Sequence, residues 1–291
     1  MAYRIVHLGV GGRGRWPVKI ATERDDIESV ALVDVNEENL RNAMAVSGLP
    51  ESACFTSLGS ALSSVETDFV VVITPPKMHA DQCLEVIRAG RHVLVEKPFT
   101  RSLSSAKQVV AEAEKYGVKI GVSQNKKYKG STMTLGRLVR EEVYGRASFG
   151  MFSELSWRKK GVHHSGEDEH AYVWERGIHD FDSMRYIFSG HPKRVWAQSF
   201  NPPWSPYKGG AGVHGWAEFQ SGVTCGYLHC FESHKKQSIC RIDCERGTLA
   251  IEGGKLTLTH RERNEVEEAS PRRMSGLHDG HHGPVGAIPR Q

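Results

Sequence analysis

The sequence predicts an α/β protein of two domains: an N-terminal parallel sheet wound with helices, and a C-terminal α+β domain with an open, mostly antiparallel sheet. The chain of 291 residues exceeds the usual size of one domain. Short β-branched runs alternate with amphipathic stretches as far as Ile120. After about Gln124, several strand-like runs follow one another through short turns. We therefore expect a first domain at 1–123 and a second at 124–291.

The first domain is predicted to hold five strands separated by helices. The strand candidates are YRIVHL, IESVALV, FVVVI, HVLV and VKIGV. Pro17 favours a helix start, and Asn36 suits the N-cap of a helix that Gly48 closes. Ser102 and Gly117 play the same parts for a later helix. Units of this kind are typical of a mononucleotide-binding fold.

The second domain is predicted to begin with a helix in STMTLGRLVREE, a strand in RASFGMFSEL and a short helix from about Asp180 to Ser189. Further strands are predicted in VWAQSF, HGWAEFQ, VTCGYLHCFE, QSICRIDC, GTLAIE and KLTLTH. From Glu265 onward the residues are charged and then rich in Gly, His and Pro. We expect a mobile tail from about residue 265, which leaves the second domain shortened.

Composition and charge argue against several classes of partner. Apolar residues make up 39% of the chain, and no apolar run approaches the roughly 18 residues of a membrane span. The net charge of +4 is dispersed along the chain, which disfavours nucleic acid. The six cysteines lack the paired spacing of a zinc site or disulfide scaffold, and MAYRIVHLGV lacks the pattern of an export signal. We expect a cytoplasmic protein that binds neither membrane nor nucleic acid.

A glycine-rich turn follows the first predicted strand. Gly9, Gly11 and Gly14 form G-x-G-x-x-G between YRIVHL and a helix candidate. The first glycine permits the tight turn, the second lets backbone approach a pyrophosphate, and the third lets helix and strand pack closely. Together with Gly12 and Arg13, they predict a phosphate cradle at a helix N-terminus and hence a Rossmann dinucleotide-binding domain. The alternative is an ordinary glycine-rich loop.

Asp34 ends the second predicted strand, about 20 positions after Gly14. An acidic residue at this point accepts hydrogen bonds from the adenosine ribose, and its charge repels a 2′-phosphate. Val35 and Asn36 follow without an Arg to pair such a phosphate, so the sequence favours NAD over NADP. The alternative role of Asp34 is a helix cap, which Asn36 fills equally well.

Two further strand exits are predicted to line the ligand crevice at the carboxyl edge of the sheet. The fourth predicted strand ends in Glu96 and Lys97, and the lysine suits a hydrogen bond to a substrate hydroxyl. A surface ion pair is the alternative. The third predicted strand exits into a Pro-rich turn. The side chains expected to contact cofactor at these exits are Thr74, Pro75, Pro76, His79, Glu96 and Lys97.

The segment EHAYVWERGIHDFDSMRYIFSG carries candidate acid–base groups. Glu175 and His179 are four positions apart, which places both on one face if the segment is helical. Imidazole accepts a hydroxyl proton near neutral pH, and a neighbouring carboxylate fixes its orientation. Because the chain has 15 histidines, a structural role for His179 is the alternative. Trp157 offers a face for stacking a sugar ring, with packing in a core as its alternative.

Histidines also cluster ahead of this segment. His163, His164 and His170 stand near the acidic residues 167–169 but satisfy no recognised ligand spacing. We therefore expect no metal site and interpret this stretch as a polar loop.

Taken together, VGVGGRG, VDVN, ITPPKMH, VEKPF, GVSQNKKY and GIHDFDSMRYIFSG resemble the glucose-fructose oxidoreductase, inositol dehydrogenase and rhizopine catabolism (Gfo/Idh/MocA) family. The resemblance spans nearly the whole chain. It implies a Rossmann domain, an open-sheet domain frequently used in dimerisation, a homodimer or homotetramer, and NAD(P)-dependent hydride transfer at a sugar or polyol hydroxyl. It also implies that Lys97 contacts the reacting hydroxyl, with a cis peptide before Pro98. His179 would accept the proton, and Glu175 would position substrate or base.

The resemblance further implies substrate contacts from Asn125 and Asp182. Three departures from the family pattern stand out: Glu175 replaces an Asp, the lysines at 126 and 127 replace arginines, and a polar tail follows KLTLTH where relatives usually have further strands and helices. Two other hypotheses therefore stay open. One is redox-assisted glycoside hydrolysis with bound NAD, and the other is dinucleotide binding without catalysis.

Overall fold

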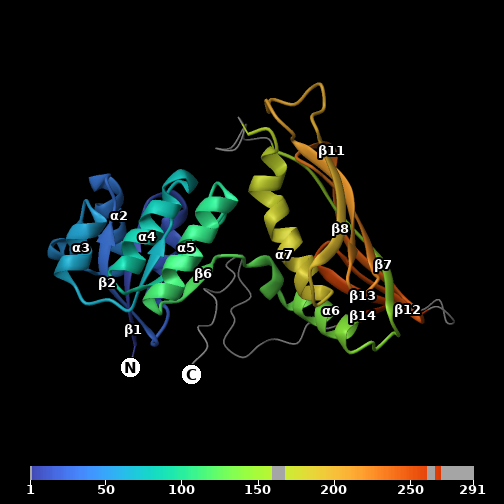
Figure 1. The fold of residues 1–291 in the computed structure, drawn as a ribbon, viewed down its shortest axis with the longest axis horizontal. Coiled ribbons are helices and arrows are strands. Elements are labelled where there is room, and N and C mark those ends of the chain that lie inside the picture. Colours follow the sequence, from blue (N-terminus) through green and yellow to red (C-terminus); the bar gives the residue numbers. More distant parts are fainter. Residues whose placement is uncertain (1, 159–167, 261–265, 270–291) are drawn as a thin grey trace. The chain divides into compact units, whose positions relative to one another are not determined.

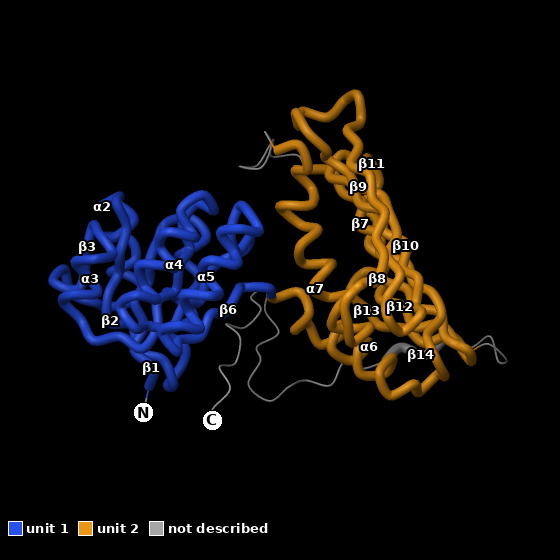
Figure 2. Tube along the Cα trace, in the orientation of Figure 1, with its two compact units in different colours: residues 1–124, 285–291 blue, residues 125–284 orange. Residues whose placement is uncertain are grey.

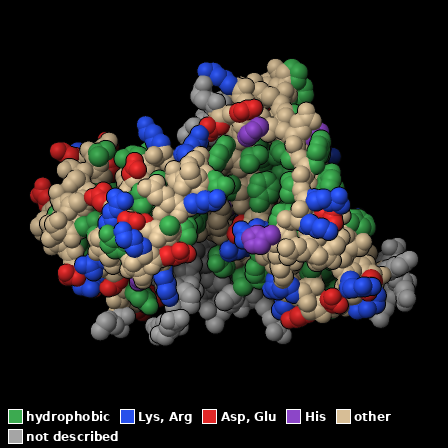
Figure 3. Space-filling view, viewed as in Figure 1, with side chains coloured by type: hydrophobic (Ala, Val, Ile, Leu, Met, Phe, Trp, Pro, Cys, Tyr) green, Lys and Arg blue, Asp and Glu red, His purple; other side chains and the backbone are tan. Residues whose placement is uncertain are grey.

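The computed structural model describes residues 2–158, 168–260 and 266–269, so the predicted tail from residue 270 onward lies outside the described residues. The described residues form two compact units, with the division between Gln124 and Asn125 (Figure 2). In Figure 3, charged side chains are scattered over unit 1, whereas hydrophobic side chains gather on the visible face of unit 2.

Unit 1 is built on a six-stranded parallel sheet with the order β3-β2-β1-β4-β5-β6 (Figure 1). Its strands are β1 (Tyr3–Leu8), β2 (Ile27–Val33), β3 (Cys54–Phe55), β4 (Phe69–Val72), β5 (His92–Val95) and β6 (Ile120–Val122). The predicted strands are confirmed, and β3 was missed because two residues carry no periodic pattern. Chain order reverses between β1 and β4, and doubly wound folds bind ligands at the carboxyl ends of such strands.

The helices of unit 1 begin and end at residues that the sequence marks. They are α1 (Arg15–Thr22), α2 (Glu37–Ser47), α3 (Leu58–Ser64), α4 (His79–Arg88) and α5 (Leu103–Tyr116). The Asn36 side chain accepts a hydrogen bond from the N–H of Glu38 at 2.8 Å, and Gly48 closes α2 with φ +73°. Ser102 and Gly117 cap α5 in the same way. Both predicted cap pairs are confirmed.

Unit 2 is built on an eight-stranded sheet with the order β14-β13-β12-β11-β7-β10-β9-β8. Its strands are β7 (Ala147–Trp157), β8 (Pro192–Phe200), β9 (Gly212–Phe219), β10 (Thr224–Cys230), β11 (Glu232–Cys244), β12 (Gly247–Glu252), β13 (Lys255–His260) and β14 (Val266–Ala269). Neighbours pair antiparallel except β7 with β10, which confirms the mostly antiparallel sheet. The helices α6 (Gly130–Arg140) and α7 (Ile178–Ile187) cover one face (Figure 1), and Leu135 and Met184 pack there against Phe152 and Ile242.

Strand β14 differs from the sequence prediction, which placed residues 266–269 in the tail. VEEA is too short to show a period of two, so nothing in the segment itself indicated a strand. Its backbone instead pairs with the edge of β13, from Leu256 to Thr259. Among the residues that the structure describes, no helix is long and apolar enough to cross a membrane.

Candidate functional site

The glycine turn of unit 1 leads from β1 through a 3₁₀ turn at Gly12–Gly14 into α1. Gly9 has φ +82°, and a Cβ atom there would collide with the backbone carbonyl of Ile73. A Cβ atom at Gly14 would collide with the carbonyl oxygen of Gly9. The N-terminus of α1 has neither a side-chain cap nor an acidic residue in its first turn. The helix dipole therefore favours an anion at this end of α1.

Asp34, directly after β2, holds this turn in place. Its Oδ2 accepts hydrogen bonds from the N–H groups of Val10 at 3.0 Å and Gly11 at 3.2 Å. Its Oδ1 accepts from the N–H of Asn36 at 2.9 Å. Asn36 itself caps α2, so the helix-cap alternative for Asp34 does not hold. A carboxylate fixed beside the glycine turn is suited to accept ribose hydroxyls.

His79 lies fully buried between two strand exits. Its Nδ1 is 2.8 Å from the carbonyl oxygen of Pro98, and its Nε2 is 2.8 Å from that of Thr74. The imidazole therefore ties the two loops together. Both ring nitrogens of His79 bond to backbone, and a cofactor contact of this residue stays a prediction. The contacts predicted for Thr74, Pro75 and Pro76 stay predictions.

Glu96 and Lys97 follow β5 at the same edge of the sheet. Glu96 is buried, and its Oε1 lies 3.4 Å from Nε of Arg13 in the glycine turn, so an ion pair joins the strand exit to the turn. Lys97 is half-buried, and the Lys97–Pro98 peptide is cis, as the family resemblance implies. These residues fit an NAD dinucleotide. The glycines and the helix N-terminus suit the pyrophosphate, Asp34 the ribose, and Lys97 the reacting end.

The predicted acid–base segment of unit 2 is helical but irregular. Val173–Gly177 form one π-helical turn that runs into α7, and such turns are frequent at functional sites. The wider turn changes the α-helical spacing from which Glu175 and His179 were predicted to share a face. Glu175 is buried, and its carboxylate pairs with Arg158. The Arg158 guanidinium also lies over the ring of Phe231, 3.9 Å from its centroid.

A buried charge cluster surrounds Asp180, the residue after His179. Asp180 accepts a hydrogen bond of 2.9 Å from the Tyr227 hydroxyl and pairs with Nζ of Lys126. Nζ of Lys126 also lies 3.4 Å from the Glu154 carboxylate. Burial disfavours the charged lysine, but the two carboxylates outweigh burial and raise the pKa of Lys126. The first turn of α7 is thus held by paired, buried charges.

His229 completes this cluster. Its Nδ1 lies 2.7 Å from the Tyr172 hydroxyl and 3.4 Å from the Asp180 carboxylate. Burial, followed by the charge of Lys126, lowers the pKa of His229 to about 3, so the imidazole is neutral. Glu154, Asp180 and His229 bring potential metal-ligand atoms within 4.8 Å of one another. The ammonium of Lys126 already provides the positive charge at this point.

The three residues predicted to bind substrate lie in different surroundings within unit 2. Asp182 pairs with Lys127 at 3.2 Å, so its carboxylate is engaged within unit 2. Asn125 begins the 3₁₀ turn that precedes α6. Trp157 ends β7 and is 57% exposed, which rules out its core-packing alternative. The His-rich stretch at 159–167 lies outside the described residues.

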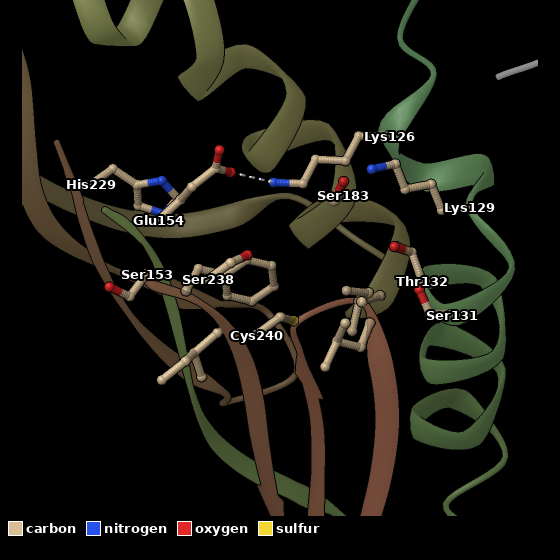
Figure 4. A pocket seen from close by; sticks show the side chains of 15 residues that line it. Lys126, Lys129, Ser131, Thr132, Ser153, Glu154, Ser183, His229, Ser238 and Cys240 are labelled. Atoms are coloured by element: carbon tan, nitrogen blue, oxygen red, sulfur yellow. Dashed lines mark hydrogen bonds and ion pairs between the residues drawn. The ribbon is translucent and has the colours of Figure 1, made fainter. Parts of the chain in front are cut away.

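A cavity of about 190 Å³ opens beside the charge cluster, between α6, α7 and the sheet (Figure 4). Ser183 and Ile187 line it, and they follow His179 by one and two helical turns, so the cavity runs along the face of α7 that carries His179. The Ser183 hydroxyl donates to the carbonyl oxygen of His179 at 2.8 Å. The hydroxyl side chains in the lining are those of Ser131, Thr132, Ser153, Ser183 and Ser238.

Sequence reasoning missed most of this unit 2 cluster. Asp180 stands beside His179 in GIHDFD, and Lys126 lies in the quoted NKKY, so both carried a usable signal. Glu154 and His229 carried none, because each sits alone in an ordinary strand pattern. Only the sheet register brings these strands next to each other.

Comparison with known proteins relates both units to one family. A family model described as "Oxidoreductase family, NAD-binding Rossmann fold" matches residues 3–124, and the GFO/IDH/MocA C-terminal domain model matches residues 133–250. Protein y4oX of Sinorhizobium fredii is 26% identical over 93% of this chain and 78% of its own length. The 1,5-anhydro-D-fructose reductase of Ensifer adhaerens is 24% identical over 76% of this chain and 67% of its own.

Solved structures share the fold. An oxidoreductase from Agrobacterium radiobacter, in complex with NAD+, L-tartaric acid and magnesium, superposes with a TM-score of 0.85 at 20% identity, covering 97% of this chain and 84% of that one. Because both domain models match, this chain belongs to the Gfo/Idh/MocA family of oxidoreductases, and its unit 1 is the family's NAD-binding Rossmann domain.

Proposed function

We propose that this protein is an NAD-dependent dehydrogenase that transfers hydride between nicotinamide and a hydroxyl carbon of a sugar or polyol. The observation that carries the proposal is a set of three residues, Asp34, Lys97 and His179. In unit 1, Asp34 bonds to the glycine turn, and Lys97 follows Glu96, which pairs with Arg13 of that turn. In unit 2, His179 is the second residue of α7, after a π-helical turn. The similar protein from Ensifer adhaerens, named a 1,5-anhydro-D-fructose reductase, supports a sugar substrate. Bound NAD supplies the hydride acceptor.

The chain's own residues orient the substrate and move one proton. Lys97 donates a hydrogen bond to the reacting hydroxyl oxygen. His179 takes the hydroxyl proton while hydride leaves the same carbon, and a carbonyl forms. Glu175, already paired with Arg158, fixes the turn that carries His179. Asp34 accepts the ribose hydroxyls of NAD and repels the 2′-phosphate of NADP.

A screen of sugars and polyols with NAD and NADP in parallel, read by absorbance of the reduced cofactor, tests this proposal. We expect turnover with NAD, and we expect Lys97→Ala and His179→Ala to lower kcat by about 10²- to 10⁴-fold. Lys107→Ala and His191→Ala, at exposed positions, are the matched controls. Unchanged turnover in both site variants contradicts the mechanism. NADH binding without reduction of any carbonyl favours a non-catalytic protein, and glycosidic cleavage without net cofactor reduction favours the hydrolase.

We also propose a homodimer or homotetramer formed through the face of the unit 2 sheet opposite α6 and α7. Register aligns Trp196, Trp216 and Met151 in one row, through Gly226 of β10. Phe149 and Leu228 lie on the same face, and these five large apolar side chains are 39% to 53% exposed. Contiguous exposed apolar groups mark interaction sites. We expect Trp216→Arg to lower the mass measured by light scattering, whereas Leu103→Arg in α5, at an even more exposed apolar position, leaves the mass unchanged.

We propose that the protein works in the cytoplasm. All six cysteines are free thiols, and burial raises the pKa of Cys83 and Cys225 to about 12. Thiols of this kind persist in a reducing compartment. Cell fractionation with an antibody tests the location, and recovery in an exported fraction contradicts it.

A further inference from the structure

The unit 2 cavity presents hydroxyl groups that the protein itself leaves without partners. Thr132 and Ser153 are only 8% and 6% exposed, yet neither side chain makes a hydrogen bond within the described residues. Both line the cavity, and Figure 4 shows them on opposite sides of it. A hydroxyl in a largely buried residue is stabilised by a hydrogen-bond partner, and because a hydroxyl can donate as well as accept, these positions suit a polar ligand, including an anion.

Positive charge exceeds negative charge around the same cavity. Lys126 and Lys129 belong to the lining, and Arg176 lies 3.4 Å from Glu154. The carboxylates among these groups are those of Glu154 and Asp180, and both are already paired with Lys126. Lys129 has no ion-pair partner in the described part of the chain. One ammonium therefore faces the cavity without a counter-charge.

The N-terminus of α6 adds donors at the same place. Lys129 is the N-cap residue of this 11-residue helix, and neither a side-chain cap nor an acidic first-turn residue satisfies its N–H groups. Ser131 and Thr132, in that first turn, line the cavity. Burial, together with the charges of Lys126 and Arg176, lowers the pKa of Lys129, a cost that an anion would offset. The helix dipole acts in the same direction.

We propose that this cavity binds an oxyanion group, so that the sugar or polyol substrate carries a carboxylate or a phosphate. The inference rests on the proposed function for the identity of the rest of the substrate. At about 190 Å³ the cavity holds the volume of roughly six water molecules, enough for the charged end of a small molecule and too little for a dinucleotide. Ser183 lines the cavity and lies one helical turn, about 6 Å along α7, from His179. The charged group therefore lies several bonds from the reacting carbon.

Binding in the absence of turnover tests the cavity separately from the reaction. Isothermal titration of the full chain with D-gluconate, inorganic phosphate and sorbitol is expected to show gluconate at least tenfold tighter than sorbitol, its uncharged counterpart. Lys129→Gln removes the charge at an exposed position, so the variant should fold normally, and it is expected to erase this difference. Thr132→Val, nearly isosteric, is expected to weaken gluconate binding about fivefold. Lys107→Gln, on α5 of unit 1, is the matched control and leaves binding unchanged.

Each outcome of this titration supports or overturns the oxyanion site. Gluconate binding that depends on Lys129 supports a carboxylate substrate, and phosphate binding alone that depends on Lys129 supports a phosphorylated one. Equal affinity for gluconate and sorbitol overturns the proposal, as does binding that Lys129→Gln leaves unchanged, or no binding of either anion. If anions bind but no sugar acid or sugar phosphate reduces NAD, the oxyanion site stands and the proposed dehydrogenase fails.

Discussion

The two units build their polar sites in different ways. In unit 1 the candidate cofactor site consists of glycines, backbone N–H groups and strand-end side chains, and Asp34 bonds to the turn of the same βαβ unit. In unit 2 the groups around α7 are buried charges. Lys126 pairs with Asp180, 54 positions away, and Tyr227 bonds to Asp180 from 47 positions away. A local motif encodes the first site, whereas only the folded sheet assembles the second.

This difference predicts two kinds of response to mutation. Backbone N–H groups at an exposed turn bond to water when no ligand binds. The residues of the cofactor site in unit 1 therefore contribute little to the free energy of folding. Buried charges must be paired with each other, so unit 2 depends on its cluster for folding. Substitutions in unit 2 should therefore change stability first, and those in unit 1 should change cofactor affinity first.

The largest expected effect is the loss of the buried carboxylate of Asp180. Asp180→Ala leaves the buried Tyr227 hydroxyl without its partner and Lys126 with Glu154 alone, and removing one member of a buried pair costs about 3–5 kcal/mol. Urea unfolding followed by tryptophan fluorescence measures this loss, because five of the six tryptophans lie in unit 2. NADH affinity, measured below the unfolding transition, should stay unchanged.

Glu141→Ala is the control for this prediction. Glu141 follows α6 and pairs with Arg137, and both side chains are exposed, so its loss should cost less than about 1 kcal/mol. Equal costs for the two variants would show that burial does not separate these ion pairs, and the contrast between the units would lose its physical basis.

Acid should weaken both units over different pH windows. Burial lowers the pKa of His7 in unit 1 to about 4, and burial with the charge of Lys126 lowers that of His229 in unit 2 to about 3. Both values lie below the roughly 6.5 of an unfolded histidine. The unfolded chain therefore binds a proton that the folded chain excludes. Stability falls as the pH drops below about 6.5, by up to about 1.4 kcal/mol per pH unit for each histidine.

The contribution of His7 should end near pH 4, and that of His229 should continue to about pH 3. Urea unfolding between pH 7 and 4 measures how the free energy of unfolding depends on pH. The expected loss over this range is about 3 kcal/mol per histidine. His7→Gln and His229→Gln should each reduce this loss. A pH dependence that neither substitution alters would assign the acid response to other groups.

The fold was largely predictable because local chemistry specifies most of it. Asn36 and Gly48 delimit α2 as the sequence indicated, and the apolar run FVVVI gives a strand buried along its whole length. The two-residue β3 and the edge strand β14 were not predictable, since each depends on a neighbouring strand and carries no periodic pattern of its own.

The candidate site was predictable only in part, for the same reason. Asp34 lies at the glycine turn because one βαβ unit brings them together. Glu175 was expected beside His179 from an α-helical spacing, but a π-helical turn and the guanidinium of Arg158 decide its position. No pattern in the sequence indicates that two backbone carbonyls hold the ring of His79. Neither the Arg158 partner of Glu175 nor the backbone partners of His79 can be inferred from the spacing of residues in the sequence.

The glycine turn provides the matching test in unit 1. Gly14→Ala places a Cβ atom against the carbonyl oxygen of Gly9, so the turn must shift away from its phosphate-binding shape. We expect NADH affinity to fall at least about 100-fold, or about 2.7 kcal/mol, as measured by fluorescence titration. Gly59→Ala, inside α3 where a Cβ atom meets only ordinary contact, is the control and should bind NADH normally. Normal NADH affinity in Gly14→Ala would show that the glycine turn does not bind the cofactor phosphates.

The smallest expected effect concerns the cap of α2. Asn36→Ala removes the acceptor for the N–H groups of Glu38 and Asn39, which should lower the free energy of unfolding by about 1 kcal/mol. The backbone N–H of residue 36 still donates to Asp34, so the carboxylate keeps its place and NADH affinity should change less than about twofold. Asn36→Asp retains the acceptor and should restore the stability. A tenfold loss of NADH affinity in Asn36→Ala would mean that the cap of α2 and the cofactor site of unit 1 form one coupled structure. Unit 1 would then resemble the buried cluster of unit 2, and the two units would differ only in how strongly their site residues depend on one another.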